Sequence, residues 1–537
     1  PKGRIRDAIG ALQAYSAHPI VLRQIPIREG GQIVGAVDLI SERAWRYREG
    51  QTSELVQMPA AVAEREHEAR AELLEQMSDY DDELLGELIE DHVPATGALF
   101  EVARRETEKA QVIPAFLGAA SHRNGVLRLM KALRHEAPDV SVLAARLGDK
   151  RALAVGFHAE NRKHLGKCVF LRALGAGIAA GAQMAGAGIG GLAEVGGKAG
   201  LDHLGPGEVG LSVKSDQLSA GRVFTAAEAK PAPDWAAAPP PAFMRIVTPV
   251  HDRDEVRLST ALSRLAEADP SLTLTQDEAT GHAVVGVQGQ MHLRQALAAL
   301  AEDFGIEVTT SVPEPRYLET ISSPVDEQYR HRKQSGGAGQ FADVAVTIRP
   351  QKRGAGFAFE EVVKGGAVPR NYIPSVEEGA REALDKGPLG FPVTDLSVTL
   401  TDGKHHAVDS SDFAFRTAGR MAMRDGLPKC APVLLQPIHR VRVHVPSIFS
   451  GAMVSLVSSL SGQVLGFERD ETHRGWDVFR ALLPVAAIDD LVQALGSATQ
   501  GSAWHEAEFD HYEEVYGRDA ERISKARLAS LPAHAHA

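Results

Sequence analysis

The sequence predicts a multidomain α+β protein, and three observations support this fold class. The chain has 537 residues, of which 44% are hydrophobic and 24% charged, a globular composition long enough for several domains. Short apolar runs divided by glycines fill residues 149–224, a pattern that favours a β-barrel. The order β-α-β-β-α occurs twice, after residue 242 and again after residue 436, and is typical of ferredoxin-like split βαβ domains.

The first part of the chain has the pattern of strands followed by charged helices. Residues 19–41 contain the strands "PIVLRQIPI" and "GQIVGAVDLI", joined by the turn "REGG". Between residues 58 and 106, apolar residues recur at spacings of three and four among many charges, which indicates solvated helices on a modest core. Residues 112–120 predict a buried strand, and "GVLRLMKALRHEAP" predicts a helix that ends at the proline. The opening residues lack an initiator methionine, and we expect them to be an interior cut in a longer protein.

Residues 173–197 contain the GxxxG spacing found in membrane helices but do not have the composition of a membrane span. Their bulk is alanine and glycine, which contribute little transfer energy, and Gln183 and Glu194 interrupt them. We therefore predict a soluble β segment punctuated by glycines, and no membrane helix. The proline-rich residues 229–242 predict a linker, and the polar residues from 519 predict a frayed tail.

Charge and cysteine content limit the classes of function. The formal net charge is −12, which disfavours a polybasic binder, although nucleic-acid contact needs only a local basic patch. The two cysteines, Cys168 and Cys430, form no CxxC pair. A disulfide scaffold and a cysteine zinc site are therefore not expected, and a reducing, cytoplasmic location fits.

Two polar segments hold most of the candidate chemistry. "HRKQSGGAGQFADVAV" (331–346) joins a basic run and a glycine run to an alternating strand, and glycines let a backbone approach a partner closely. "TDGKHHAVDSSDFAF" (401–415) contains His405, His406 and Asp409. Adjacent residues of an extended segment point to opposite faces and no third ligand is suitably spaced, so no metal site is predicted. No Gly-x-Ser-x-Gly elbow surrounds its serines, and a catalytic nucleophile is not predicted either.

Several motifs, in order, resemble those of bacterial elongation factor G, a translational GTPase. They are "HRKQSGGAGQFADV", "VPRNYIPSVEEGAREAL", "GFPVTDLSVTLTDGKHHAVDSSDFAFRTAG" and "EFDHYEEV", and the likeness extends over essentially the whole chain. The resemblance implies six consecutive parts. These are the remnant of an α/β GTPase domain with an inserted subdomain (1–136), a β-barrel domain II (137–228), a ferredoxin-like domain III (229–313), an α+β arm or domain IV (314–436), a ferredoxin-like domain V (437–518) and a flexible tail (519–537).

The resemblance also implies a role for the two polar segments. In the family these loops lie together at the tip of the arm and contact messenger and transfer RNA in the A site of the small subunit. Glycines permit close approach, while polar side chains meet phosphates and 2′-hydroxyls without reading base sequence. The RNA-contacting residues that the resemblance implies are Ser335, Gly336, Gly337, Gly339, Gln340, Asp402, Gly403, His406, Asp409 and Ser410.

Of the two adjacent histidines, the resemblance selects His406. It aligns with the family's tip histidine, whereas position 405 is where the family commonly has an aromatic residue. We therefore expect His406 to be the functional histidine of the pair.

Few residues of this chain are candidates for binding or hydrolysing a nucleotide. A GTPase needs the P-loop pattern GxxxxGK[ST] to hold phosphates and position magnesium, and the chain has no such pattern, no switch segments and no Asn-Lys-x-Asp motif. The resemblance therefore assigns GTP and Mg²⁺ to the intact parent, and we expect no catalytic residue and no bound cofactor in this chain. The family's Gly-Ser-Ala motif becomes Gly118, Ala119 and Ala120, whose backbone amides are the candidate nucleotide contacts.

Further departures from the family pattern indicate a divergent paralogue that resembles elongation factor G. Gln290 stands in place of an acidic residue of the third domain. Ser459 and Ser461 stand where the fifth domain usually has RNA-binding cations.

The sequence thus predicts an elongation factor G-like translation factor whose intact parent couples GTP hydrolysis to translocation of tRNA and mRNA on the ribosome. Two alternatives stay open: a paralogue for ribosome splitting or rescue, and a non-enzymatic ribosome-binding protein that lacks a GTPase domain. The expected partner is the ribosome, through rRNA, tRNA and mRNA at the decoding site. We expect a monomer that makes no membrane contact.

Overall fold

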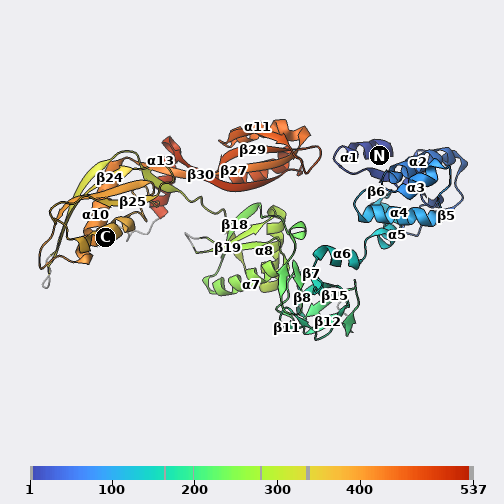
Figure 1. Ribbon diagram of the computed structural model, residues 1–537, viewed down its shortest axis with the longest axis horizontal. Helices are drawn as coiled ribbons and strands as arrows, with labels where there is room; N and C mark the ends of the chain where they lie inside the picture. Colours follow the sequence, from blue (N-terminus) through green and yellow to red (C-terminus); the bar gives the residue numbers. More distant parts are fainter. Residues whose placement is uncertain (1–3, 163–164, 197–198, 278–280, 334–338, 531–537) are drawn as a thin grey trace. The chain divides into compact units, whose positions relative to one another are not determined.

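The computed structural model describes residues 4–162, 165–196, 199–277, 281–333 and 339–530. The chain divides into two compact units. Unit 1 comprises Pro1–Ser311 with Arg469–Trp476, and unit 2 comprises Val312–Glu468 with Asp477–Ala537. Both units combine helices with sheets, which confirms the multidomain α+β class (Figure 1). No helix among the described residues is long and apolar enough to cross a membrane.

Unit 1 begins with a helical layer on a four-stranded antiparallel sheet of order β2-β3-β4-β5. The predicted hairpin is confirmed, since Gln24 pairs with Asp38 and Glu29 with Gln32 across its turn. Leu73 and Leu99 pack into the core of this layer. The elements are α1 (Ile5–Gln13), β1 (Ile20–Leu22), β2 (Gln24–Glu29), β3 (Gln32–Asp38), β4 (Arg43–Arg46), β5 (Glu54–Val56), α2 (Ala60–Ser78), α3 (Asp82–Ile89), α4 (Thr96–Glu108), β6 (Ile113–Ala115), α5 (Val126–Glu136) and α6 (Val140–Leu147).

β1 and β6 form a separate parallel pair, in which Ile20 lies opposite Ile113 and Leu22 opposite Ala115. The prediction of a buried strand is wrong for β6, because Ile113 is 43% exposed. The physical reason is that β6 pairs with β1 alone among the described sheets.

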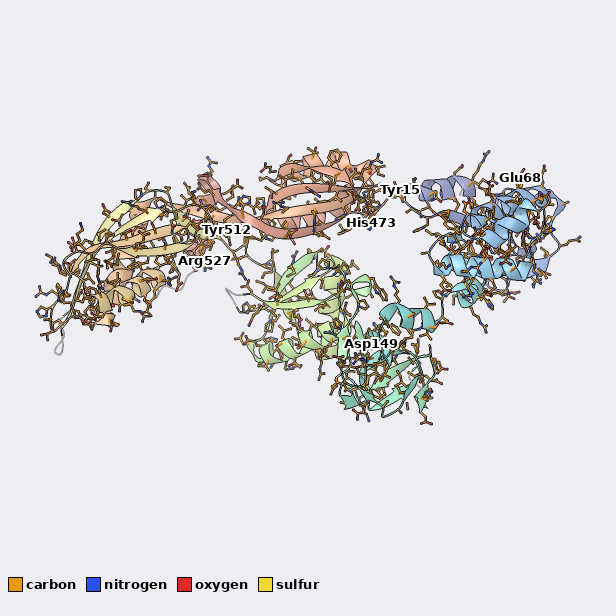
Figure 2. All side chains as sticks on the ribbon, in the orientation of Figure 1. Tyr15, Glu68, Asp149, His473, Tyr512 and Arg527 are labelled. Atoms are coloured by element: carbon orange, nitrogen blue, oxygen red, sulfur yellow. The ribbon has the colours of Figure 1, made fainter. Side chains whose placement is uncertain are left out.

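The next part of unit 1 is a seven-stranded antiparallel sheet of order β13-β12-β15-β8-β7-β16-β17, in the range where a β-barrel was expected. Strands also occupy the glycine-rich residues 173–197, which confirms their β prediction. Asp149, labelled in Figure 2, precedes this sheet, and its carboxylate accepts from Lys230 Nζ at 2.6 Å. Two further pairs, β9 with β14 and β10 with β11, form separate two-stranded sheets. The strands of this part are β7 (Ala154–Arg162), β8 (Gly166–Ala173), β9 (Ile178–Ala179), β10 (Gln183–Met184), β11 (Ala187–Gly188), β12 (Gly191–Ala193), β13 (Gly200–Leu201), β14 (His203–Leu204), β15 (Val209–Val213), β16 (Arg222–Phe224) and β17 (Ala229–Pro231).

The first predicted ferredoxin-like domain follows β17. Its antiparallel sheet has the order β19-β20-β18-β21, and its two helices contact each other. With the strands numbered one to four along the chain, this is the order 2-3-1-4 of a split βαβ fold. The elements are β18 (Phe243–Pro249), α7 (Glu255–Ala268), β19 (Thr273–Gln276), β20 (Ala283–Val287), α8 (Gln290–Phe304) and β21 (Val308–Ser311).

Unit 2 begins with a four-stranded sheet, β23-β24-β26-β25, against which α9 and α10 pack (Figure 1). Alternate residues of β24, among them Val344, Val346 and Ile348, are buried, which confirms the predicted half-buried strand. The elements are β22 (Leu318–Ile321), β23 (Val325–Lys333), β24 (Gln340–Pro350), β25 (Phe357–Glu361), α9 (Ile373–Ala383), β26 (Leu396–Lys404) and α10 (Asp412–Gly426).

The end of unit 2 repeats the split βαβ order. β30 and β29 flank β27, β28 pairs with β29, and β22 also pairs with β27. The elements are β27 (Pro432–Pro446), α11 (Ser450–Ser459), β28 (Gln463–Arg469), β29 (Trp476–Pro484), α12 (Ile488–Ala498), β30 (Trp504–Val515) and α13 (Gly517–Ser530).

A helix, α13, occupies most of the segment for which we expected a flexible tail. Arg527 Nε donates to Gly390 O at 3.2 Å, and its guanidinium carbon lies 5.6 Å from the centre of the Phe391 ring. Tyr512 OH on the preceding strand donates to Arg316 O at 3.1 Å. Figure 2 labels both Tyr512 and Arg527. The contacts of Arg527 join the helix to Gly390 and Phe391, which the polar composition of the segment did not predict.

Candidate nucleic-acid interface

Strand register brings the two polar segments to one end of the sheet in unit 2. β24 pairs with β23 on one side and with β26 on the other. Lys333 lies opposite Gln340, and Asp343 lies opposite Lys404. The start of β24 and the end of β26 are therefore neighbours, and we call this end the tip.

Three hydrogen bonds connect the two segments at the tip or brace the second one. Phe341 N donates to Asp409 O at 2.8 Å, and Ser410 Oγ donates to Phe341 O at 2.7 Å. Ser410 Oγ also accepts from His406 N at 2.9 Å. Serine and aspartate side chains commonly bond nearby backbone in this way. The second segment is thus held against the start of β24.

Gly339 allows the close approach of the two segments. A Cβ atom at this position would lie 2.7 Å from Asp409 Oδ1, closer than real Cβ contacts. Ser335, Gly336 and Gly337 lie outside the described residues.

The two histidines have different surroundings. His406 Nδ1 lies 3.0 Å from Asp409 Oδ2, and its ring meets the Phe341 ring edge-on at 6.3 Å. The Asp409 amide also lies 3.3 Å from the same nitrogen, farther than the carboxylate. Because Nδ1 faces Asp409, Nε2 of His406 is the ring atom left for an external partner. His405 Nδ1 instead lies 3.3 Å from Ala367 O.

Exposed cations surround these loops. Arg332, Lys333 and Lys404 are exposed and form no ion pair within the described part of the chain. Arg330, in contrast, donates from Nε to Asp343 Oδ2 at 2.8 Å, and Asp343 is fully buried. The buried Asp343 carboxylate holds the Arg330 side chain of β23 in place, whereas the three exposed cations are available to contact phosphates.

Gln340, Asp402 and Gly403 have mainly local contacts. Gln340 Oε1 lies 2.9 Å from His331 Nε2. Asp402 is exposed and accepts from Gly403 N at 2.8 Å, whereas Gly403 is buried beneath Asp343 O. Gly403 therefore serves strand packing, and Asp402 presents its carboxylate outward.

Tyr372 is a positioning residue that the sequence reasoning missed. Its hydroxyl donates to Ser410 O at 3.2 Å, and its ring stacks on Phe415 at 4.8 Å. The only sequence signal was its place in the "VPRNYIPSVEEG" motif, because the contact joins residues 38 positions apart.

The candidate nucleotide contacts lie in unit 1, after β6. Ala119 N donates to Asn124 O at 2.9 Å, so this amide already has a partner. A Cβ at Gly118 would lie 2.9 Å from the same oxygen. The amides of Gly118 and Ala120 have no hydrogen bond within the described residues, so these two could donate to a nucleotide.

Comparisons with known proteins give one consistent result. Three family models match: "Elongation Factor G, domain III" at residues 238–312, "Elongation factor G, domain IV" at 313–431 and "Elongation factor G C-terminus" at 433–523. An elongation factor G-like protein of Synechocystis sp. (strain ATCC 27184 / PCC 6803 / Kazusa) is 37% identical over 515 residues, which cover 95% of this chain and 77% of that protein. The crystal structure of a protein from Thermus thermophilus superposes with a TM-score of 0.81 at 31% identity, and the match covers 98% of this chain and 79% of the other.

Proposed function

This chain belongs to the elongation factor G family, and from that premise we propose that it carries the ribosome-binding arm of a GTP-dependent factor that moves tRNA and mRNA. The observation that carries the proposal is the tip, where the second polar segment is braced against the start of β24, near exposed cations without ion pairs among the described residues. Such a surface meets phosphates and 2′-hydroxyls and reads shape rather than base sequence. A factor that serves every codon requires this kind of contact.

GTP hydrolysis belongs, in this proposal, to the full-length protein. The helix α5 exposes Leu127, Met130 and Leu133 at 53%, 57% and 53%. Beside it, β1 and β6 form a parallel pair, and parallel sheets are normally covered on both faces. This apolar surface supports the packing of further layers of an α/β GTPase domain. The amides of Gly118 and Ala120 then contribute to guanine binding.

The test is the His406→Ala variant of the full-length protein in a reconstituted translocation assay. Translocation should slow roughly tenfold, as expected for loss of a hydrogen bond to a charged group. Ribosome-stimulated GTP hydrolysis should stay unchanged, because no tip residue serves in nucleotide binding in this proposal. The matched control is His405→Ala, which should change translocation little, since the ring of His405 faces Ala367 O of its own domain.

Equal translocation rates for the parent protein and His406→Ala would overturn the proposed role of the arm. Dissociation of ribosomal subunits without translocation would instead support the paralogue for ribosome splitting.

A further inference from the structure

A cavity of about 600 Å³ lies in unit 1 between the two helices α4 and α5 and the strands β3 and β4. Residues that directly follow β1 and β6, among them Arg23 and Phe116, complete its wall. We call it the α4–α5 cavity. Its volume falls in the range of small-molecule sites, and Gly118, Ala119 and Ala120 do not line it. It is therefore separate from the candidate guanine contacts.

The cavity also differs from the surface offered to further GTPase-domain layers. Its wall on α5 is formed by Arg128, Lys131 and His135, which recur at spacings of three and four on one helix face. The exposed apolar residues Leu127 and Met130 do not line it. The cavity wall and the exposed apolar surface thus lie on different faces of α5.

Three cations in the wall have no carboxylate partner. Arg43 on β4 and Arg128 and Lys131 on α5 form no ion pair within the described residues. Burial lowers the pKa of the Arg128 guanidinium, which Asp38 raises and Arg43 lowers to smaller extents. The Arg128 charge is therefore partly desolvated, and the nearby Asp38 offsets it only in part.

The acidic residues of the wall already have partners. Glu136 accepts from Arg23 at 2.7 and 3.1 Å, and the pair is buried. Asp38 Oδ1 accepts from the amide and the hydroxyl of Ser41, both at 2.8 Å. Glu101 accepts at 3.0 Å from an arginine on its own helix. Asp38 keeps its negative charge and offsets part of the Arg128 charge, but no carboxylate of the wall forms an ion pair with the three cations among the described residues.

Buried donors in the same wall lack acceptors. Arg23 Nε, Arg128 Nε and Trp45 Nε1 are buried and have no hydrogen-bond partner within the described residues. The Arg128 guanidinium carbon lies 3.8 Å from the Trp45 ring centre, which fixes both side chains in the wall. A buried donor without an acceptor is unfavourable, so the site favours a ligand or water that brings acceptor oxygens.

We propose that the α4–α5 cavity binds a small phosphorylated molecule, with its phosphate oxygens on Arg43, Arg128 and Lys131. Phosphate suits this wall because it offers several acceptors and pairs with arginine through two parallel hydrogen bonds. Phe100 and Phe116 line the remaining wall and cover the organic part of the ligand. A cavity of this size accepts a small molecule, whereas an RNA backbone would bind along an open groove.

The test uses inorganic pyrophosphate as the probe on the whole chain at low salt. Isothermal titration calorimetry should show saturable binding, and the fluorescence of Trp45 should change with the same dependence on concentration. Lys131→Ala and Arg43→Ala, both at exposed positions that tolerate substitution, should each weaken binding about tenfold. Trp45→Phe should remove the fluorescence change but leave the calorimetric heat of pyrophosphate binding.

The matched control is Arg134→Ala, which removes an exposed cation of α5 that does not line the cavity. It should leave pyrophosphate affinity unchanged. The absence of saturable binding by the parent chain, or equal losses for Arg134→Ala and Lys131→Ala, would overturn the proposal. Binding of a single-stranded RNA that depends on Lys131 and that pyrophosphate does not displace would also overturn it.

Discussion

His406 and Asp409 illustrate how single side chains set the chemistry of the tip. His406 Nδ1 lies 3.0 Å from Asp409 Oδ2, which leaves Nε2 of the same ring for an external partner. A Cβ at position 339 would lie 2.7 Å from Asp409 Oδ1, so a larger residue there would displace this carboxylate and disturb the contact. The local geometry therefore follows from three residues in two separate segments of the chain, just outside β24 and β26.

Glu319 gives unit 2 a pH-dependent stability. Its side chain is fully buried, and burial raises the pKa of its carboxyl from 4.5 to about 7, against the lowering effect of the amides of Phe391, Leu389 and Gly390. Its Oε1 accepts from Phe391 N at 2.7 Å, while Oε2 has no partner within the described residues. A folded-state pKa above the unfolded value means that the folded state binds more protons, so the free energy of unfolding falls as pH rises from about 4.5 to 7.

We predict that Glu319→Gln removes this fall in the free energy of unfolding at rising pH. Relative to the parent chain, the variant should gain stability between pH 5 and pH 8, by at most roughly 3 kcal/mol for a shift of this size. Thermal unfolding at both pH values checks this difference. An identical pH dependence in the two chains would show that Glu319 ionises normally in the folded protein.

The helices α9 and α10 pack at close range and stabilise the core beneath the sheet that carries the tip. A Cβ at Gly379 would lie 1.9 Å from Arg416 O on the facing helix. Phe415, Ala418 and Ala422 of α10 are fully buried in the same core. Such close backbone approach depends on the absence of one side chain.

We predict that Gly379→Ala separates the two helices and destabilises them by about 1–3 kcal/mol or more, the usual cost of overpacking. Hydrogen exchange of the whole chain should show faster exchange in peptides from α9 and α10.

The control for this prediction is Gly496→Ala in α12, where a Cβ would meet no atom within 4 Å. That change should slow exchange locally, because alanine stabilises a helix interior by up to about 1 kcal/mol over glycine. Unchanged exchange in α9 and α10 of Gly379→Ala would contradict the packing account.

Over the whole chain, charge is distributed unevenly. The net charge is −12, yet the tip carries exposed, unpaired Arg332, Lys333 and Lys404 among the described residues. An acidic protein with a basic tip directs its contact with RNA to that end, since local potential rather than net charge decides where a polyanion binds.

We predict that ribosome binding by this chain is steeply salt-dependent, because phosphate contacts act through counterion release. In co-sedimentation at several salt concentrations, Lys333→Ala and Lys404→Ala should each reduce the slope by roughly one. Lys525→Ala on α13, also exposed, should leave the slope unaltered if the tip provides the contacts. Tight binding that is indifferent to salt would refute phosphate contact at the tip.

We also predict that this chain alone does not hydrolyse GTP. It contains no GxxxxGK[ST] pattern to hold the nucleotide phosphates. Titration with a fluorescent GTP analogue should show at best very weak binding, and micromolar affinity that depends on magnesium would contradict this expectation.

Local patterns were sufficient to predict much of the fold. The alternation along β24, the three-and-four spacing of the helices and the repeated β-α-β-β-α order all depend on near neighbours in the chain, and each is confirmed. The choice of His406 rests on family resemblance, and it stays a prediction that the contact with Asp409 supports.

Only the tertiary structure decided the features that depend on contacts between distant residues. The half-exposed β6, the contacts of α13 with Gly390 and Phe391, and the brace of Tyr372 on Ser410 have no local signature. The unpaired cations of the α4–α5 cavity come together only when strand β4 and helix α5 meet, although these elements lie far apart in the chain. The sequence by itself thus determined periodic elements, motifs and family, while burial and charge pairing were decided by which distant side chains the fold brings into contact.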